Sequence, residues 1–435
     1  MQLDADKLRA RIEPLFQENF DKFGELGAAV SVWQNGKPLL DLHGGFRDSR
    51  RGQPWDEKTL VLIWSATKGL GSACLLHVLQ EHKIDIERRV GEFWPEFAQA
   101  GKEKITLAQL LSHQAGLAAL DRKVDVLDYA SVIDAIEKQE PNWPPGTAHG
   151  YHARTFGFLL GELVRRISGT QLGEYWRKTF AEPLGLDLWI GLPEKENARV
   201  ATMYAAKVGP AAAGPQPQNR QSGPVAAATR TRPVASSDFY ADVATKGTFA
   251  HKVFSSPFGL SAVSAMNKPE IRAQAIVSFG GIGSASSLAK FYAMLANGGR
   301  IEDRPASAQS QSGSDLRRGG QFFSEKTIGW MTTTLTDGTD RVFQIPTAFS
   351  AGFMKDSRMS RRKIFGRSTR LRETPVRLGP TARQASPFGH PGAGGSNAFA
   401  DPENGISFAY VMNQMEQSVL PNEKSLRLMD AIYTP

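Results

Sequence analysis

A serine and a lysine stand three residues apart at the head of a long apolar segment. Ser65 and Lys68 belong to the tetrapeptide Ser-Ala-Thr-Lys, and a mostly apolar run follows through Leu79. If this run is a helix, the lysine lies one turn after the serine on the same face, within reach of its hydroxyl. A serine becomes a good nucleophile when a base takes its proton, and lysine is such a base once burial or a nearby charge lowers its pKa. The pair therefore predicts a nucleophile with its own base, beside a helix N-terminus that would favour an oxyanion.

The same spacing occurs twice more, at Ser287 with Lys290 and at Ser360 with Lys363. Only Ser65 lies between an apolar tetrapeptide and a segment that is apolar nearly all round, which predicts a buried helix. Ser287 lies on another predicted helix, over 288–295, and we interpret it as structural. Ser360 lies among arginines, which is typical of a solvated stretch.

A tyrosine follows a rigid turn in the middle of the chain. The turn Pro144–Gly146 precedes Tyr151, and a helix is predicted from 155 to 167. A phenol near a lysine ammonium can be held partly as phenolate and can pass a proton to the serine or to a leaving group. The alternative is a half-buried tyrosine that is hydrogen-bonded at a helix start. His149 and His152 flank the tyrosine and are candidates to line the same cleft.

A third candidate is the glycine-dense segment Phe388–Ser396. Glycines let a backbone approach a ligand closely, and exposed peptide N–H groups can bind a developing oxyanion. Because Pro391 has no N–H group, Ala393 is the plausible donor. The alternatives are a loop that simply leads into a strand, or a phosphate cradle, although the chain has no GxxxxGK[ST] pattern.

Composition restricts the class of protein. With 435 residues, of which 41% are hydrophobic and 22% charged, the chain is typical of a soluble globular protein with room for two domains. The net charge of +8 invites a nucleic-acid partner, but much of the excess lies in 358–383 without any nucleic-acid-binding motif. We interpret that stretch as a basic surface loop and expect no nucleic-acid partner.

The single cysteine, Cys74, excludes an intramolecular disulfide and fits a reducing compartment. The N-terminus does not resemble a signal peptide, and no apolar run of about 18 residues is present. The sequence thus predicts a cytoplasmic protein without a membrane span. No HExxH or CxxC pattern occurs, so we expect neither a metal nor a cofactor.

Hydrophobic periodicity predicts one sheet built from both ends of the chain around a helical insert. The predicted elements are a helix over 6–23, a hairpin of 28–33 and 38–46 across Asn35-Gly36, mostly helices over 68–186, strands at 348–354, 396–400 and 406–412, and a helix over 424–433. The stretch 209–233 is predicted to be a linker or a long surface loop, and a second polar, low-complexity stretch covers 306–320. The expected fold class is α/β of the α+β type, with an antiparallel sheet and flanking helices. We expect one domain from 1–66 with 262–435, and a mainly helical domain over 67–261.

The ordered motifs resemble those of the serine β-lactamase and penicillin-binding-protein superfamily. They are Ser65–Lys68, Leu110–Leu117, Pro145-Gly146 ahead of Tyr151, and His390–Gly392. The likeness extends from about Gly27 to Met412 and is greatest to family VIII carboxylesterases, which are esterases related to class C β-lactamases. It implies a β-lactamase/transpeptidase-like fold with the active site between an α/β and a helical domain. It further implies that Ser65 is the nucleophile, Lys68 its base and Tyr151 a shared acid and base, with the N–H groups of Ser65 and Ala393 as the oxyanion hole.

Two departures from the class C pattern narrow the implied substrate. Ala153 stands where those enzymes have an asparagine that contacts a lactam, and His390 replaces the lysine that would hold a lactam carboxylate. The resemblance therefore implies a serine carboxylesterase that acts on neutral small-molecule esters, with His390, Gly392 and His152 contacting the substrate. A histidine that only supports the loop is an equal alternative for His390.

Four other functions stay open from the sequence alone. Three would use the same serine: a β-lactamase, a D-amino-acid peptidase and an acyltransferase. The fourth is a catalytically silent scaffold that binds a partner through 358–383.

Overall fold

The computed structural model of the chain describes residues 1–207, 237–301, 320–366 and 386–434. The predicted loop 209–233, all but the last residue of 306–320, and residues 367–383 of the basic stretch lie outside the described residues.

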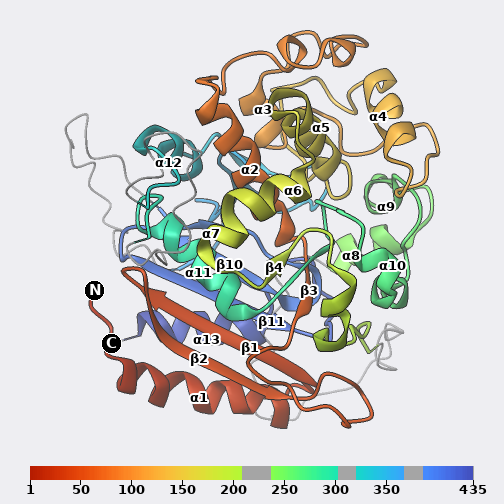
Figure 1. Cartoon of the computed structure of the whole chain (residues 1–435). Coiled ribbons are helices and arrows are strands. Elements are labelled where there is room, and N and C mark those ends of the chain that lie inside the picture. The colour runs from red at the N-terminus through yellow and green to blue at the C-terminus, as the bar shows by residue number, and fades with distance from the viewer. Residues whose placement is uncertain (208–236, 302–319, 367–385, 435) are drawn as a thin grey trace, which may run out of the picture.

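Strands from the two ends of the chain form one antiparallel sheet (Figure 1). In spatial order they are β2 (Lys37–Gly45), β1 (Gly27–Gln34), β11 (Ile406–Met412), β10 (Asn397–Asp401), β9 (Phe388–Gly389), β8 (Met354–Lys355), β7 (Pro346–Phe349) and β6 (Thr336–Thr339). The pairing of β1 with β11 joins the N-terminal hairpin to the C-terminal strands. The predicted sheet from both termini is therefore confirmed.

The hairpin between β1 and β2 turns at Asn35-Gly36, where φ is 49° and 76°. Two consecutive positive φ angles are those of a type I′ turn, whose twist matches that of the strands. Alternate residues of β1 then face opposite sides of the sheet. Val30 and Val32 pack with helices α1 (Ala5–Asp21) and α13 (Glu423–Tyr433), whereas Ala29 and Trp33 face the core that includes α11 (Ala285–Ala296). The sheet is therefore buried on both faces.

The helices between the two halves of the sheet gather on one side of it (Figure 1). They are α2 (Thr67–Glu81), α3 (Leu107–Leu111), α4 (Tyr129–Lys138), α5 (Phe156–Ser168), α6 (Leu172–Trp176), α7 (Glu182–Leu184), α8 (Ser237–Ala244) and α9 (Phe249–Ser255), followed by α10 (Pro269–Arg272) and, later, α12 (Glu325–Thr332). All eight strands of the sheet come from the predicted discontinuous domain, and α2–α9 come from 67–261. The domain boundaries themselves stay a prediction.

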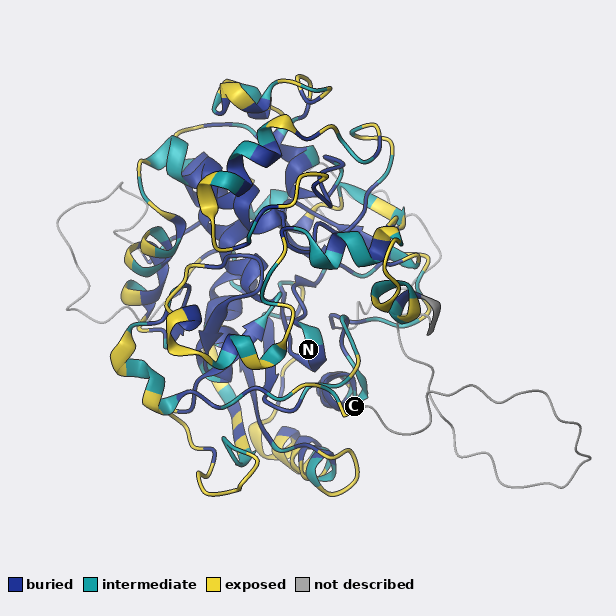
Figure 2. Ribbon diagram, turned by 90° about the vertical axis from the view of Figure 1, so that its right-hand side faces the viewer, coloured by how far each residue is buried: buried dark blue, intermediate teal, exposed yellow. Residues whose placement is uncertain are grey.

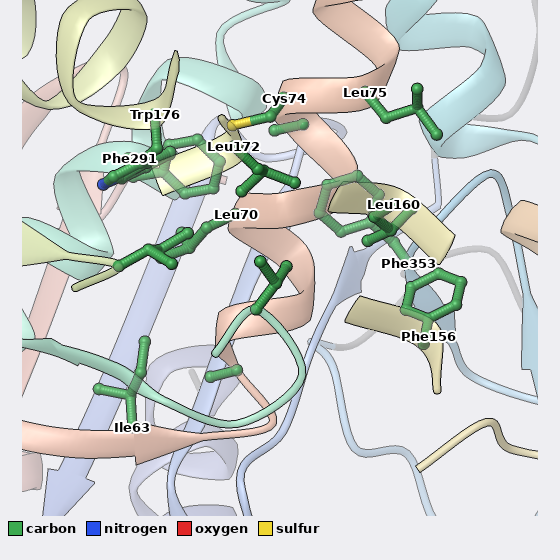
Figure 3. Packing of buried hydrophobic residues seen from close by; sticks show 14 of the residues in the cluster. Ile63, Leu70, Cys74, Leu75, Phe156, Leu160, Leu172, Trp176, Phe291 and Phe353 are labelled. Carbon is green, nitrogen blue, oxygen red and sulfur yellow. The ribbon is translucent and has the colours of Figure 1, made fainter. Parts of the chain in front are cut away.

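Helix α2 passes through the centre of the molecule, as its composition predicts. Every residue from Thr67 to Leu79 is buried. Leu70, Cys74 and Leu75 pack there against aromatic and aliphatic side chains of α5, α6 and α11 (Figure 3). A helix with such surroundings holds the residues at its N-terminus rigidly.

A second, three-stranded sheet was not predicted. It consists of β3 (Val61–Trp64), β5 (Gly281–Gly283) and β4 (Leu188–Trp189), with β5 in the middle. Strands of two to four residues, one of them Gly-Ile-Gly, are too short for a visible alternation. This small sheet matters because β3 leads directly into Ser65.

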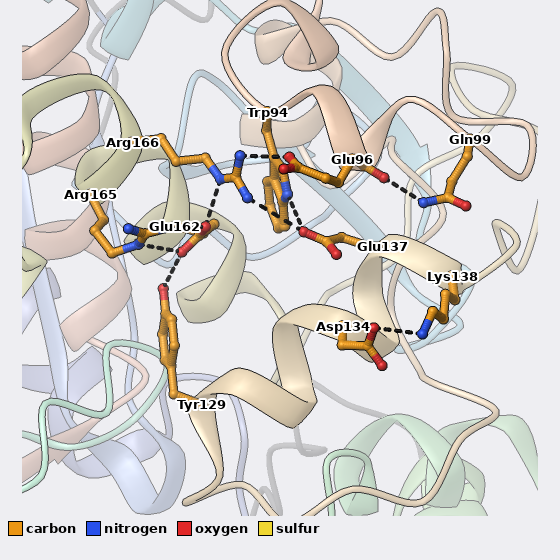
Figure 4. Close-up of polar contacts among 10 residues, drawn as sticks. All are labelled: Trp94, Glu96, Gln99, Tyr129, Asp134, Glu137, Lys138, Glu162, Arg165 and Arg166. Carbon is orange, nitrogen blue, oxygen red and sulfur yellow. Dashed lines mark hydrogen bonds and ion pairs between the residues drawn. The ribbon is translucent and has the colours of Figure 1, made fainter.

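A buried carboxylate ties the helical part together (Figure 4). Glu162 of α5 is 1% exposed and accepts hydrogen bonds from Arg165, Arg166 and the Tyr129 hydroxyl. Arg166 also donates a hydrogen bond to Glu96, and this bond links α5 to the segment before α3. The network connects segments around α4 and α5 through paired charges, as a buried carboxylate requires.

The exterior is formed mainly by loops and the outer faces of helices, and the two termini lie near each other (Figure 2). Among the described residues, no helix combines the length and apolarity that crossing a bilayer requires.

Candidate active site

Ser65 lies in the short turn between β3 and α2, and its side chain is partly exposed. Trp64 just before it has φ of +50°, which is uncommon for a bulky residue. Thr67 holds this turn: its Oγ1 donates to the Trp64 carbonyl at 2.5 Å and accepts from the Gly281 amide at 2.8 Å. The turn presents Ser65 at the N-terminus of α2, where the helix dipole favours negative charge.

Lys68 is fully buried, and its Nζ lies 3.2 Å from the Ser65 Oγ. The same nitrogen donates to the carbonyls of Ala153 at 2.8 Å and Ser278 at 2.6 Å. Burial first, and the charge of Arg154 second, lower its pKa well below the ordinary value. A neutral amine has two protons and one lone pair. In that form the two carbonyls would take the protons, and the lone pair would be left for the Ser65 hydroxyl.

Tyr151 is hydrogen-bonded to Ser65, and its ring centroid lies 4.9 Å from the Lys68 Nζ. The ring stacks on Phe343 at 4.9 Å, and the Tyr151 amide donates to Asp340 at 3.2 Å. The prediction that the lysine holds a partial phenolate is wrong. Burial raises the pKa of Tyr151 and lowers that of Lys68, so the interior favours a neutral phenol beside a neutral amine.

Replacement of Tyr151 by phenylalanine tests the hydroxyl alone. Because Tyr151→Phe keeps the ring on Phe343, we expect kcat on the ester substrates that the resemblance implies to fall about 10²- to 10³-fold, with little change in KM. Steady-state kinetics on a p-nitrophenyl ester measure this. Tyr129→Phe, which removes a hydroxyl bound to Glu162, is the matched control. Equal kcat values for Tyr151→Phe and wild type would contradict an acid–base role.

The glycine-dense loop lies against the strand that carries Ser65. A Cβ atom on Gly392 would stand 2.3 Å from the Ile63 carbonyl oxygen, so only glycine permits this approach. The Gly392 amide donates to the Ser396 carbonyl, and the Gly394 amide donates to Ser418. Contact between Gly392 and a substrate stays a prediction.

Two amides beside this contact have no acceptor. Among the hydrogen bonds of the described residues, neither the Ser65 amide nor the Ala393 amide donates. Ala393 is partly exposed and is the first residue of a short 3₁₀ turn, Ala393–Gly395. Ser65 is two residues after Ile63, and Ala393 follows Gly392, so each free N–H group belongs to one of the two segments in this contact. An oxyanion hole requires such a pair of free N–H groups.

The contact between Gly392 and Ile63 gives a second prediction. Gly392→Ala must push the loop away from β3, and we expect kcat/KM to fall about 10²-fold because the Ala393 amide moves with it. In Gly161→Ala the added Cβ meets only the Tyr129 hydroxyl, at 3.5 Å, so this variant serves as the control. Unchanged kcat/KM in Gly392→Ala would show that the position of this loop does not affect catalysis.

His390 is 1% exposed, and its ring centroid lies 5.9 Å from that of Tyr151. Its Nδ1 donates to the Pro391 carbonyl at 2.8 Å, and its Nε2 is buried without a partner among the described residues. Burial and the nearby Lys68 lower the pKa of His390 to about 3. The His390–Gly392 motif therefore carries no positive charge at neutral pH.

Contact between His152 and a substrate stays a prediction, and the bonding of its ring favours a structural role. The residue is fully buried, its Nδ1 donates to the Gly150 carbonyl, and its Nε2 accepts from the Leu117 amide. His149 is likewise buried, at 3% exposed, and both its ring nitrogens bond to threonines of β6 and β7. Both histidines shape the turn that carries Tyr151.

Three residues that hold this site were not found from the sequence. Ser278 supplies a carbonyl to Lys68, Asp340 anchors the Tyr151 amide, and Arg154 adds a buried positive charge. Ser278 and Asp340 act across 210 and 189 residues of chain. No local pattern marks such partners.

The other two serine–lysine pairs have different surroundings. Ser287 lies in the first turn of α11, where its Oγ accepts from the Asp187 amide at 2.9 Å. Ser360 donates to the Arg362 carbonyl at 2.9 Å, in a stretch where Arg362 also pairs with Glu423 of α13. Both arrangements agree with structural roles.

Comparison with known proteins defines the class. The fold matches a penicillin-binding protein homologue from Caulobacter crescentus, with a TM-score of 0.76 and 30% identity over 100% of this chain and 98% of the other. It also matches a family VIII carboxylesterase, with a TM-score of 0.74 and 30% identity over 98% and 97% of the two chains. The fold is thus β-lactamase/transpeptidase-like, as the resemblance implies.

Sequence comparison gives the family. The family model described as Beta-lactamase matches residues 16–430. Esterase/beta-lactamase LipL of Mycobacterium tuberculosis is 27% identical over 404 residues, which are 91% of this chain and 78% of that protein. The chain belongs to the beta-lactamase family and is a serine hydrolase of that family.

Proposed function

We propose that the chain is a carboxylesterase that cleaves neutral small-molecule esters through an acyl-enzyme on Ser65. The observation that carries the proposal is the placement of Lys68, whose Nζ donates to two carbonyls and lies 3.2 Å from the Ser65 Oγ. With its pKa lowered by burial, the neutral amine of Lys68 would have one lone pair for the serine proton. It is therefore suited to act as the general base for the serine.

Acylation begins with attack of the Ser65 Oγ on the ester carbonyl. The hydroxyl proton passes to the Lys68 Nζ while the new C–O bond forms. The amides of Ser65 and Ala393 stabilise the oxyanion of the tetrahedral intermediate. Tyr151 then donates its phenolic proton to the alkoxide as the ester C–O bond breaks, and the Lys68 ammonium returns a proton to the phenolate.

Deacylation repeats these steps with water. The pair of Lys68 and Tyr151 takes a proton from water as its oxygen attacks the acyl carbonyl. Collapse of the second tetrahedral intermediate breaks the bond to the Ser65 Oγ, which regains its proton. The acid leaves, and both side chains return to their neutral forms.

The absence of a positive charge at the His390–Gly392 motif favours neutral esters as substrates. Because His390 is uncharged at neutral pH, it cannot hold a substrate carboxylate as a lysine would. Ala153 offers a methyl group where class C enzymes have an amide. His390 and Gly392 are proposed to border the ester in this uncharged setting. The names of the relatives, an esterase/beta-lactamase and a family VIII carboxylesterase, support the same choice.

A substrate panel tests this proposal directly. We expect kcat/KM for p-nitrophenyl butyrate to exceed that for nitrocefin by at least about 10³-fold, because the lactam carboxylate would meet no cation at His390. A D-alanyl peptide measures peptidase activity, and added alcohols measure acyl transfer. A preference for nitrocefin or for the peptide would replace the esterase with a lactamase or a peptidase.

A further inference from the structure

Arg154 is a buried cation close to the proposed base. The residue is 6% exposed, and its guanidinium donates to the carbonyls of Gly259 at 2.6 Å and Phe254 at 3.3 Å. It lies 5.2 Å from the centroid of the Phe279 ring. Within the described residues it forms no ion pair, and its Nε is buried without a partner. Burial lowers the pKa of Arg154 to about 10, so the side chain stays charged at neutral pH.

Two short segments, Ala153-Arg154 and Ser278-Phe279, connect Arg154 with Lys68. The carbonyls of Ala153 and Ser278 accept from the Lys68 Nζ. Ala153 is followed by Arg154, and Ser278 is followed by Phe279. The Arg154 guanidinium lies over the Phe279 ring. The Ser278 hydroxyl also donates to the Arg154 carbonyl at 2.6 Å, which ties the segments together. The backbone of Arg154 and the Lys68 amine are therefore held by the same two segments, and the guanidinium lies over Phe279 of one of them.

Among the described residues no carboxylate forms an ion pair with Arg154 or Lys68, although the charge of Asp125 acts on Arg154. The titratable groups that face Lys68 are Tyr151, His113, His152, His390 and Arg154. Burial lowers the pKa of each of the three histidines, so they are neutral at neutral pH. The nearby carboxylates are Asp340, which accepts from backbone amides beside Tyr151, and Asp125, which acts on Arg154. A second cation at Lys68 would meet Arg154 in a medium that screens poorly.

We propose that Arg154 is a positioning residue that keeps Lys68 in its neutral amine form, ready to accept the Ser65 proton near neutral pH. The inference rests on the proposed function, because it assigns a purpose to the neutral amine. It also explains why a buried arginine in this position has carbonyl partners but no ion pair. A carboxylate partner would cancel the charge that acts on Lys68.

The direction of the pH effect follows from the sign of the charge. Only the neutral amine can accept a proton, so reactivity is lost as the pH falls through the pKa of Lys68. A nearby cation lowers that pKa, and its removal raises it. The acid limb of the profile should therefore move to higher pH when Arg154 is neutralised.

The experiment measures the rate at which a fluorophosphonate labels Ser65 between pH 4 and pH 10, a range chosen to span about three units either side of neutrality. We expect the acid limb of Arg154→Gln to shift upward by ~1 pH unit, with labelling restored at high pH. Arg154→Lys, which keeps the charge, should retain the wild-type limb. Arg272→Gln removes another buried arginine, 8% exposed, and should cause no shift.

The outcomes separate this inference from the proposed function. A lower rate at every pH with an unmoved limb would make Arg154 a structural residue and overturn the inference. No labelling of Ser65 in wild type would instead overturn the proposed function. If Arg154→Gln does not fold, Arg154→Met replaces it. In either case, ¹⁵N NMR of wild type must show Lys68 as a neutral amine at pH 7, and an ammonium signal there would also overturn the inference.

Discussion

Replacement of Ser65 by alanine is expected to lower kcat/KM for p-nitrophenyl butyrate by about 10⁵-fold. The hydroxyl is the only group of this side chain that can bond to the acyl carbon, so the remaining amides can stabilise an oxyanion but cannot form the intermediate. Steady-state kinetics with titrated enzyme measure the loss. Because the side chain is partly exposed, the methyl group of alanine should leave the fold intact, which circular dichroism checks.

The chain offers a matched control for this variant. Ser360→Ala removes the serine of another pair with the same spacing, and its hydroxyl donates only to the Arg362 carbonyl. We expect wild-type kinetics from it. Ester turnover that survives in Ser65→Ala, or that disappears in Ser360→Ala, would contradict the assignment of the nucleophile.

The second large effect is expected from Lys68→Met, which should lower kcat/KM by about 10⁴-fold. The substitution keeps an unbranched apolar side chain but removes the lone pair that accepts the serine proton. It also leaves the carbonyls of Ala153 and Ser278 without a donor, which costs about 1–3 kcal/mol for each buried group. The kinetic loss must therefore be separated from a loss of stability.

Lys355→Met makes that separation. Lys355 is 3% exposed, and its Nζ donates to two carbonyls, those of Thr332 and Ser386, as the Lys68 Nζ does to its own pair. We expect both variants to lose similar stability in urea titrations, and only Lys68→Met to lose activity. Equal kinetic losses in the two variants would show that a buried lysine, not a base, accounts for the effect.

Much of the site could be predicted because its chemistry is local. Ser65 and Lys68 are one helical turn apart, and their apolar neighbours indicate that this turn is buried. Tyr151 and Ala393 are far from them in sequence, and only the order of several motifs connected them to the pair. The sheet from both termini was also readable, because β1 and β11 are long apolar strands and Asn35-Gly36 marks the hairpin.

The sequence is least informative where the chain turns irregularly. His152 follows Tyr151 directly, yet its ring is fully buried and bonded at both nitrogens, because side-chain directions in a turn have no fixed period. The phenolate prediction for Tyr151 failed because the sequence does not reveal how completely the phenol and Lys68 are desolvated. Asp340 and Ser278 escaped notice because each acts through a contact between segments that only the fold brings together.

The central claim is that an acyl group is carried by the Ser65 oxygen, and its most direct test is mass spectrometry of the protein quenched during turnover of p-nitrophenyl butyrate. We expect a fraction of the protein to gain the mass of one butyryl group, and peptide mapping to place it on Ser65. Butyryl on another residue, or ester turnover without any adduct while a burst of nitrophenol precedes the steady state, would contradict the account.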